Sequence, residues 1–329
     1  MSKVAVIGMG GTIAMAPSAS GGIVPSLAAD DLVASVPGLA TLDAKITATT
    51  LRSLPSPSLG FADLVELSDR VRAEIAGGAD GVVITHGTDT IEETAFFLDL
   101  TVPEDAPVVV TGAMRHPEAP GADGPANLYA AISVALAPAA RGLGCLVVMS
   151  DEVHGARFVR KSHTSSTGAF VSPGFGPLGL VVEGDPRIRG AARVGLTLPA
   201  DPRVVERRVG MVTMALGDDG TLLRLAGMDP PAFDGLVIAG LGAGHVPAAI
   251  VPLVAELAAR VPVVLSTRTG SGSVLRQTYG YPGSERDLLE RGLIHSGFLD
   301  PAKARVLLQL LLASNAEKPE IIAAFDQYR

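Results

Sequence analysis

The stretch that decides the fold is KVAVIGMGGTIA, residues 3–14. It opens with a short, continuous apolar run, residues 3–8, which ends in a cluster of glycines. A run of this length without polar alternation is typical of a strand that is buried on both faces. The segment therefore predicts a first buried strand, followed by a glycine turn that holds Thr12 at the carboxyl end of that strand.

The same pattern recurs along the first half of the chain and alternates with helical patterns. Further buried strands are predicted at residues 81–85, 107–111 and 143–149. Between them, apolar residues share a helical stripe over residues 64–75, and residues 123–135 are rich in alanine. Strands that alternate with helices in this way predict an α/β fold, with a mostly parallel sheet flanked by helices.

The length of the chain predicts two domains. Its 329 residues exceed the roughly 250–300 at which a single core usually stops growing. Residues 185–206 are rich in Pro, Arg and Gly, and a smaller α/β pattern follows them. We predict a larger N-terminal α/β domain over residues 1–185, a linker over 186–207 and a smaller C-terminal α/β domain over 208–329. The second domain is expected to hold strands at 208–215, 235–240 and 261–267 and helices at 247–260 and 301–313.

Composition excludes several classes of function. A formal charge of −8 argues against a nucleic-acid partner, which would favour a basic face. No apolar stretch is long and unbroken enough to predict a membrane span. The lone cysteine, Cys145, allows no intrachain disulfide, and the N-terminal segment does not fit a signal peptide, so we expect a cytoplasmic protein. The six histidines show no metal-ligand spacing, and neither a metal nor a cofactor is expected.

Residues 8–14, GMGGTIA, allow more than one interpretation. They fit neither the dinucleotide fingerprint nor a Walker motif, which argues against a nucleotide-binding module. A glycine turn is often only structural. Here it also presents a threonine where open α/β sheets bind their ligands, next to backbone N–H groups that can stabilise an oxyanion.

Three further polar segments carry candidate chemistry. THGTDT at residues 85–90 and TGAMR at residues 111–115 each follow a predicted strand. Asp89 or Thr90 could simply cap the next helix, or the carboxylate and hydroxyls could converge on a ligand. Lys161 could be a solvated surface charge. Beside a threonine hydroxyl and a carboxylate, however, a lysine can activate the hydroxyl as a nucleophile.

At these segments the sequence resembles the bacterial-type L-asparaginase and glutaminase-asparaginase family. The resemblance lies in GGTIA (10–14), THGTDTIEETA (85–95), VTGAMR (110–115), ADGPANLY (122–129), GPLG (176–179) and PAKARVLLQL (301–310), and it covers nearly the whole chain. Two threonine motifs in this order and at this separation are highly specific.

The resemblance implies an L-asparaginase, an amidohydrolase that cuts the side-chain amide of L-asparagine to L-aspartate and ammonia. It implies that Thr12 forms an acyl-enzyme and that Thr88, Asp89 and Lys161 form a second constellation. Which threonine attacks first stays open. Asp89 would also bind the substrate's α-ammonium and Ser56 its α-carboxylate, with oxyanion donors from the backbone N–H groups near Thr88 and Ala113.

The resemblance also implies a homotetramer, built as a dimer of dimers, in which a neighbour's second domain completes each site. The partner-subunit glutamate falls near Glu285. The chain departs from the family pattern at the loop tyrosine, expected near Gly22 or Ile23, at Pro57 in place of a glutamine, and near His245, where an asparagine is expected. Tyr279 and Tyr281 lie close in sequence and could substitute for missing groups.

Two alternatives remain beside an asparaginase. One is a glutaminase or glutaminase-asparaginase on the same scaffold, and the other is a catalytically silent protein that binds amino acids. In addition, residues 17–27 are rich in Ser, Gly and Pro and lack a tyrosine. We expect this stretch to close over the site as a lid.

Overall fold

The computed structural model describes the whole chain except residues 18–21, 104, 190–194 and 229–231. By its internal contacts the chain divides into two compact units, Met1–Arg193 and Val194–Arg329. Each unit is built on its own sheet.

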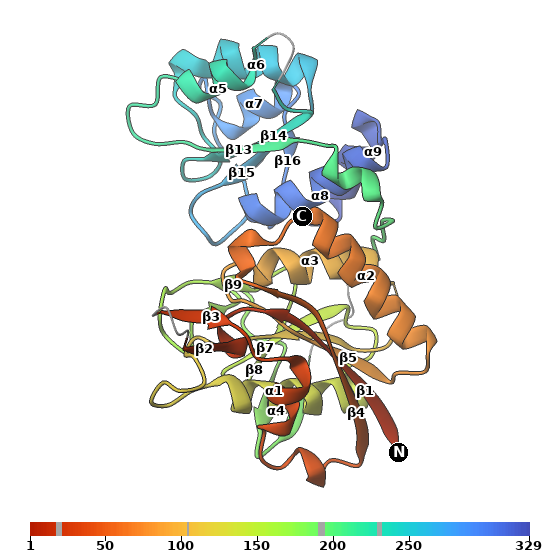
Figure 1. The fold of residues 1–329 in the computed structure, drawn as a ribbon. Helices are drawn as coiled ribbons and strands as arrows, with labels where there is room; N and C mark the ends of the chain where they lie inside the picture. Colours follow the sequence, from red (N-terminus) through yellow and green to blue (C-terminus); the bar gives the residue numbers. More distant parts are fainter. Residues whose placement is uncertain (18–21, 104, 190–194, 229–231) are drawn as a thin grey trace. The chain divides into compact units, whose positions relative to one another are not determined.

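The first unit is built on an eight-stranded sheet whose larger part is parallel (Figure 1). The parallel part runs in the order β4 (Ala44–Leu54), β1 (Ser2–Gly10), β5 (Gly81–Thr85), β6 (Val108–Thr111) and β7 (Cys145–Met149). An antiparallel extension then adds β8 (Glu152–Gly155), β11 (Gly179–Val182) and β12 (Asp185–Ile188).

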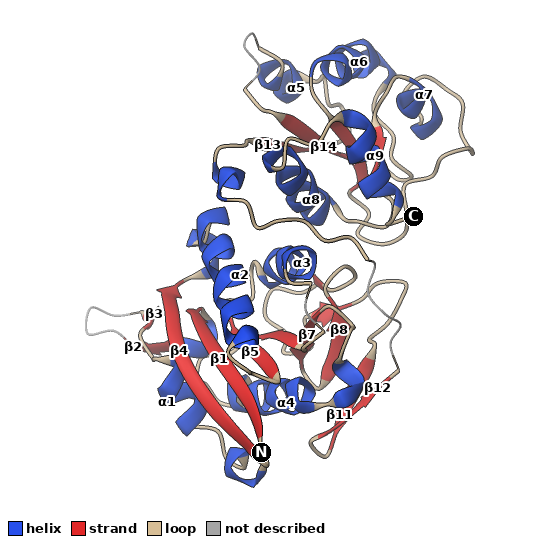
Figure 2. Cartoon of the chain, turned by 90° about the vertical axis from the view of Figure 1, so that its right-hand side faces the viewer, coloured by secondary structure: helices blue, strands red, loops and turns tan. Residues whose placement is uncertain are grey.

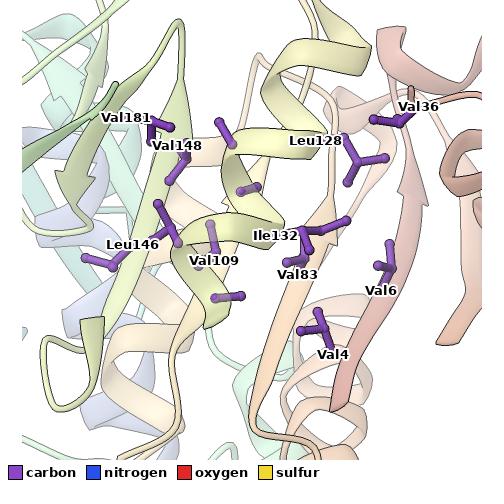
Figure 3. Packing of buried hydrophobic residues seen from close by; sticks show 14 of the residues in the cluster. Val4, Val6, Val36, Val83, Val109, Leu128, Ile132, Leu146, Val148 and Val181 are labelled. Atoms are coloured by element: carbon purple, nitrogen blue, oxygen red, sulfur yellow. The ribbon is translucent and has the colours of Figure 1, made fainter. Parts of the chain in front are cut away.

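Both faces of this sheet are covered because its central strands are apolar on both sides. In β1, Val4 and Val6 point to one face, and Ala5 and Ile7 point to the other. The helices α1 (Ala29–Ala34) and α4 (Gly124–Leu136) pack on the first face, where Figure 3 shows the buried cluster. The helices α2 (Phe61–Ala76) and α3 (Ile91–Thr101) pack on the second (Figure 1).

Short elements follow the carboxyl end of β1 and the β8 strand. A 3₁₀ turn, η1 (Thr12–Ala14), leads into a hairpin of β2 (Met15–Pro17) and β3 (Ile23–Pro25). The segment predicted as a lid contains β3, and its residues 18–21 lie outside the described residues. The two-residue strands β9 (Arg160–Lys161) and β10 (Phe170–Val171) pair with each other.

The second unit has a four-stranded parallel sheet in the order β13 (Val209–Thr213), β14 (Gly235–Gly240), β15 (Val263–Thr267) and β16 (Ile294–His295). One face carries a core shared with α5 (Thr221–Ala226), α6 (Val251–Arg260) and α7 (Glu285–Glu290). The helix α8 (Pro301–Ala313) packs against β13 and β14 (Figure 2), and α9 (Lys318–Asp326) contacts β16.

The predicted fold class is confirmed, and β5, β14 and α8 have the predicted bounds. The long strand β4 and the antiparallel strands β8, β11 and β12 were not predicted. Residues 186–188 of the predicted linker belong to β12, whereas the rest of the linker lies between β12 and β13. Among the described residues, no helix combines the length and apolar character needed to cross a membrane.

Candidate active site

The candidate site forms where four neighbouring parallel strands of the first unit end at one edge of the sheet. Ser56 follows β4, Thr12 follows β1, Thr88 follows β5, and Ala113 follows β6. Because the strands are parallel and adjacent, their carboxyl ends meet, and loops from four separate parts of the chain come together. Thr12, Thr88 and Ala113 stand in segments that were predicted to follow strands, whereas Ser56 was named only through the family resemblance, and the sheet order brings the four loops to one edge.

Two glycines bring the Thr12 and Thr88 loops into direct contact. Gly11 has a φ of 81°, and a Cβ on it would lie 2.2 Å from the Cα of Gly87. No side chain can occupy that space, so Gly11 is required both by its backbone conformation and by packing. Thr12 and Thr88 are therefore each the residue immediately after one of two glycines whose backbones touch.

Ser56 packs against Gly87. Its side chain is buried, and a Cβ on Gly87 would lie 2.6 Å from the Ser56 Oγ. The Thr90 hydroxyl donates a hydrogen bond of 3.2 Å to the Ser56 carbonyl. Thr90 precedes α3 but makes no side-chain capping bond, so its hydroxyl ties the β5 loop to the β4 loop instead of capping the helix.

Lys161 reaches the β5 loop from β9. Its Nζ donates to Thr88 Oγ1 over 2.9 Å and to Asp89 Oδ1 over 2.6 Å. The Lys161 side chain is 16% exposed, whereas that of Asp89 is 60% exposed. The Lys161 backbone N–H is held by the Glu92 carboxylate at 2.9 Å. Lys161 is therefore not a solvated surface charge. Its ammonium group pairs with Asp89 and at the same time lies within hydrogen-bonding distance of the Thr88 hydroxyl.

The nucleophile candidate Thr12 has a different environment. It is partly exposed, and its hydroxyl has no hydrogen-bond partner within the described part of the chain. It begins η1, where Ala14 N–H donates to the Gly11 carbonyl over 2.9 Å. The turn fixes the backbone at Thr12 and leaves the hydroxyl free to meet a ligand.

Two backbone N–H groups at the site are available to an anion. Neither Thr88 N nor Ala113 N makes a backbone hydrogen bond to the described residues. Ala113 is fully buried and Thr88 is 6% exposed. An unpaired N–H group in such a place is costly unless a ligand accepts from it, which is the property of an oxyanion hole.

A buried histidine supports the β5 loop, and sequence reasoning missed its role. His86 is fully buried, with Nδ1 lying 2.8 Å from the Gly87 carbonyl and Nε2 3.1 Å from Thr94 Oγ1. A carbonyl can only accept, so Nδ1 carries the proton and Nε2 accepts from the threonine. Burial lowers the pKa of His86 to about 4, so the ring is neutral and holds the carbonyl of the residue before Thr88.

A carboxylate and an amide hold the β6 loop in place. Asp123 accepts from Met114 N at 3.0 Å and from Arg115 N at 2.9 Å. Asn127 donates from Nδ2 to the Gly112 carbonyl and to Asp123 Oδ2, both over 3.0 Å. Both residues fall in the ADGPANLY segment, where the spacing of Asp and Asn by one helical turn was the available signal.

Glu285 belongs to the second unit, so its contribution to this site stays a prediction. Its side chain is fully buried at the start of α7 and accepts from Thr278 N, Tyr279 N and His245 Nε2 at 3.0, 2.9 and 3.1 Å. Burial opposes ionisation, but these hydrogen bonds outweigh it and lower the pKa of Glu285. The other ring nitrogen of His245 lies 2.8 Å from the exposed Tyr281 hydroxyl.

Within the described residues, no cluster of three or more His, Cys, Asp or Glu side chains could hold a metal ion. The site instead offers hydroxyls, one ion pair and unpaired backbone N–H groups. Such groups suit acyl transfer at an amide or ester carbonyl.

Comparison with known proteins points to the same chemistry. Residues 3–193 match the family model described as "Asparaginase, N-terminal", and residues 208–325 match "Glutaminase/Asparaginase C-terminal domain". The chain is 41% identical to a probable L-asparaginase of Deinococcus radiodurans, over 99% of this chain and 98% of the relative. It is 33% identical to a glutaminase-asparaginase of Pseudomonas fluorescens, over 100% and 91%.

A solved structure resembles the whole chain. The crystal structure of a probable cytoplasmic L-asparaginase from Campylobacter jejuni covers 100% of both chains with a TM-score of 0.87 and 32% sequence identity.

Proposed function

The chain belongs to the asparaginase family, and from that premise we propose that it hydrolyses the side-chain amide of L-asparagine to L-aspartate and ammonia through a threonine nucleophile. The observation that carries the proposal is the position of Lys161 Nζ, which lies within hydrogen-bonding distance of both Thr88 and Asp89. A lysine placed in this way stabilises the deprotonated form of a neighbouring hydroxyl.

In the proposed reaction, Thr12 Oγ attacks the amide carbonyl carbon. The developing oxyanion accepts from the Thr88 and Ala113 N–H groups, whose unpaired state supports this role. The carbon–nitrogen bond then breaks, and the amide nitrogen takes the threonine's proton and leaves as ammonia. Water next attacks the ester and releases L-aspartate, while Thr12 regains its proton.

The Thr88–Lys161–Asp89 set handles the proton in these steps. In the order proposed here, Thr12 forms the ester and the Thr88 set activates the water that hydrolyses it. The reverse order, with Thr88 attacking first, uses the same groups. The two orders differ in which hydroxyl carries the acyl group.

Substrate is held by its two fixed charges. Asp89 is exposed, so its carboxylate can pair with both Lys161 and the α-ammonium group of the substrate. Ser56, buried against Gly87, donates to the α-carboxylate. No metal and no cofactor enters this scheme, because hydroxyls and backbone dipoles provide every group that acyl transfer needs.

Ammonia release from L-asparagine and from L-glutamine, measured side by side, tests the activity. We expect faster release from L-asparagine. A higher kcat/KM on L-glutamine would instead identify a glutaminase, an activity that the name of the Pseudomonas relative makes the second candidate. Binding of either amino acid without ammonia release would identify a catalytically silent binding protein and contradict the proposal.

We also propose a homotetramer, a dimer of dimers, in which Glu285 of a neighbouring chain completes each site. The long segment between β15 and α7 carries Tyr279 and Tyr281 at its surface, which supports a role in contact with another molecule. The cytoplasm is the proposed location, in line with the name of the Campylobacter relative. The partners are then a small amino acid and further copies of the chain, with neither nucleic acid nor membrane.

A further inference from the structure

A small, largely apolar cavity is lined in part by the residue that follows the candidate nucleophile. It has a volume of about 160 Å³, and Ile13, the residue after Thr12, forms part of its wall. Leu27, Leu32 and Leu128 contribute to the apolar lining, together with Pro117 and Pro125. Val36 also lines the cavity and lies beside Leu128, as Figure 3 shows. None of these side chains takes part in the proposed reaction. Their link to it is the peptide bond between Thr12 and Ile13.

Two opposite charges line the same cavity without pairing to each other. The exposed Asp31 uses Oδ2 to accept from Ala28 N at 3.1 Å, and among the described residues its Oδ1 has no partner. Arg115 donates from Nη1 to the carbonyls of Pro120 and Gly121, at 3.4 and 3.0 Å. Its Nη2 and Nε have no partner within the described part of the chain, and Asp31 forms no ion pair there. The cavity therefore offers an acceptor for a cation and a donor for an anion beside an apolar space.

We propose that this cavity binds a free α-amino acid with a short branched aliphatic side chain, such as L-leucine. Such a molecule carries the three features that the cavity complements: a carboxylate for Arg115, an ammonium group for Asp31 and an isobutyl group for the apolar walls. The volume fits, because an apolar cavity of about 150 Å³ can hold a molecule of the size of benzene. A glycine molecule lacks the apolar group and leaves that space unfilled.

Occupancy of the cavity bears on the reaction through Ile13. A ligand packed against this side chain restrains η1 and so the backbone that carries Thr12. This consequence rests on the proposed function, whereas binding of the amino acid does not. Binding is therefore tested by calorimetry, a readout that needs no turnover.

The first experiment titrates the full chain with L-leucine, glycine, 4-methylpentanoate and 3-methylbutylamine. The last two keep the apolar group but lack the ammonium or the carboxylate, respectively. We expect L-leucine to bind about tenfold more tightly than either, since each lost contact removes a charge-assisted hydrogen bond, and we expect no measurable binding of glycine. The titration is repeated with saturating L-aspartate, which should leave leucine binding unchanged.

The second experiment uses variants that keep the fold, as checked by circular dichroism. Asp31→Asn should bind L-leucine and 4-methylpentanoate equally well, because the ammonium has lost its partner. Asp30→Asn is the matched control, since it changes an exposed carboxylate on the same helix that does not line the cavity. Val36→Phe should fill the cavity and reduce leucine affinity at least about tenfold.

Three results would overturn the proposal. One is the absence of heat from millimolar L-leucine. The second is leucine binding that Val36→Phe and Asp31→Asn leave unchanged. The third is loss of leucine binding when L-aspartate is present, which would place the leucine in the catalytic site instead.

Discussion

Gly11 and Gly87 touch through their backbones, because a Cβ on Gly11 would lie 2.2 Å from the Gly87 Cα. This contact joins the loops that carry Thr12 and Thr88, which are far apart in the sequence. Every role proposed for the two hydroxyls depends on this contact, since both hydroxyls must lie close to the carbonyl carbon of one bound substrate.

We predict that Gly11→Ala separates the two loops and destroys the site. The new methyl group overlaps Gly87, and the backbone at Gly11, with φ 81° and ψ −177°, lies in a region almost restricted to glycine, which adds about 1–3 kcal/mol of strain. Gly217→Ala is the matched control, because Gly217 has a similar φ of 78° but no atom near the space that a Cβ would occupy. Chemical unfolding should show that Gly11→Ala lowers the free energy of unfolding by at least about 2 kcal/mol more than Gly217→Ala does. Only Gly11→Ala should lose turnover. Equal losses in the two variants would count against the packing argument.

Lys161→Met should lower kcat by roughly 10²–10⁴-fold with little change in KM. The reason is that Lys161 contacts Thr88 and Asp89 and is assigned to activation, not to gripping the substrate. Arg160→Met, a change to the neighbouring cation, should keep most of the activity. A raised KM with unchanged kcat in Lys161→Met would move this lysine from activation to substrate binding.

Acid should destabilise the protein through its buried histidines. Burial lowers the pKa of His86 to about 4, against an ordinary value near 6.5, so between these values the unfolded chain binds more protons than the folded one. Stability is therefore full above about pH 6.5 and falls as the pH drops toward 4, by on the order of 3 kcal/mol for this residue. Burial lowers the pKa of His154 to about 4 as well, so it adds a loss of the same sign.

Urea unfolding between pH 7 and pH 4.5 measures this effect. His86→Gln keeps a donor for the Gly87 carbonyl and an acceptor for Thr94, and it should reduce the pH slope by up to one proton, about 1.4 kcal/mol per pH unit. Combining it with His154→Gln should reduce the slope further. A slope that neither substitution alters would mean that these rings are protonated in the folded state.

Mixed oligomers test the shared site. Thr12→Ala chains and Glu285→Gln chains should each be inactive alone and should regain activity when co-assembled, because some sites then combine an intact Thr12 with an intact Glu285. Glu290→Gln, which changes an exposed carboxylate at the other end of α7, should be active without mixing. If proven mixed oligomers stayed inactive, each subunit would be building its own site.

The sequence predicted the parallel sheet well because most of its strands are continuous apolar runs. Continuous apolar runs that end in glycine or threonine marked β1, β5 and β6, and a continuous apolar run before Ser150 marked β7. By contrast, β4 reads AKITATTLRSL, with exposed and half-buried positions that alternate because it is the edge strand next to β1. That pattern is typical of many exposed segments and does not by itself indicate a strand.

The sequence named the candidate residues of the site but not the residues that support them. Thr12, Thr88 and Asp89 stand in motifs that follow predicted strands, whereas the roles assigned to them and to Lys161 came from the family resemblance and stay predictions. His86 stands in the same motif, but its role follows from complete burial and from two hydrogen bonds that depend on the sheet order. Likewise, nothing in the sequence indicates that Ile13, directly after Thr12, lines a cavity with Asp31 and Arg115.

The most direct test of the account is ammonia release from L-asparagine by Thr12→Ala, with Thr12→Ser as the control that restores a hydroxyl. We predict that the alanine variant folds like the parent and loses turnover by on the order of 10³-fold or more, as when a nucleophile is removed from a catalytic set. The serine variant should keep measurable activity. A Thr12→Ala protein with the specific activity of the parent would contradict the assignment of the nucleophile and with it the proposed mechanism.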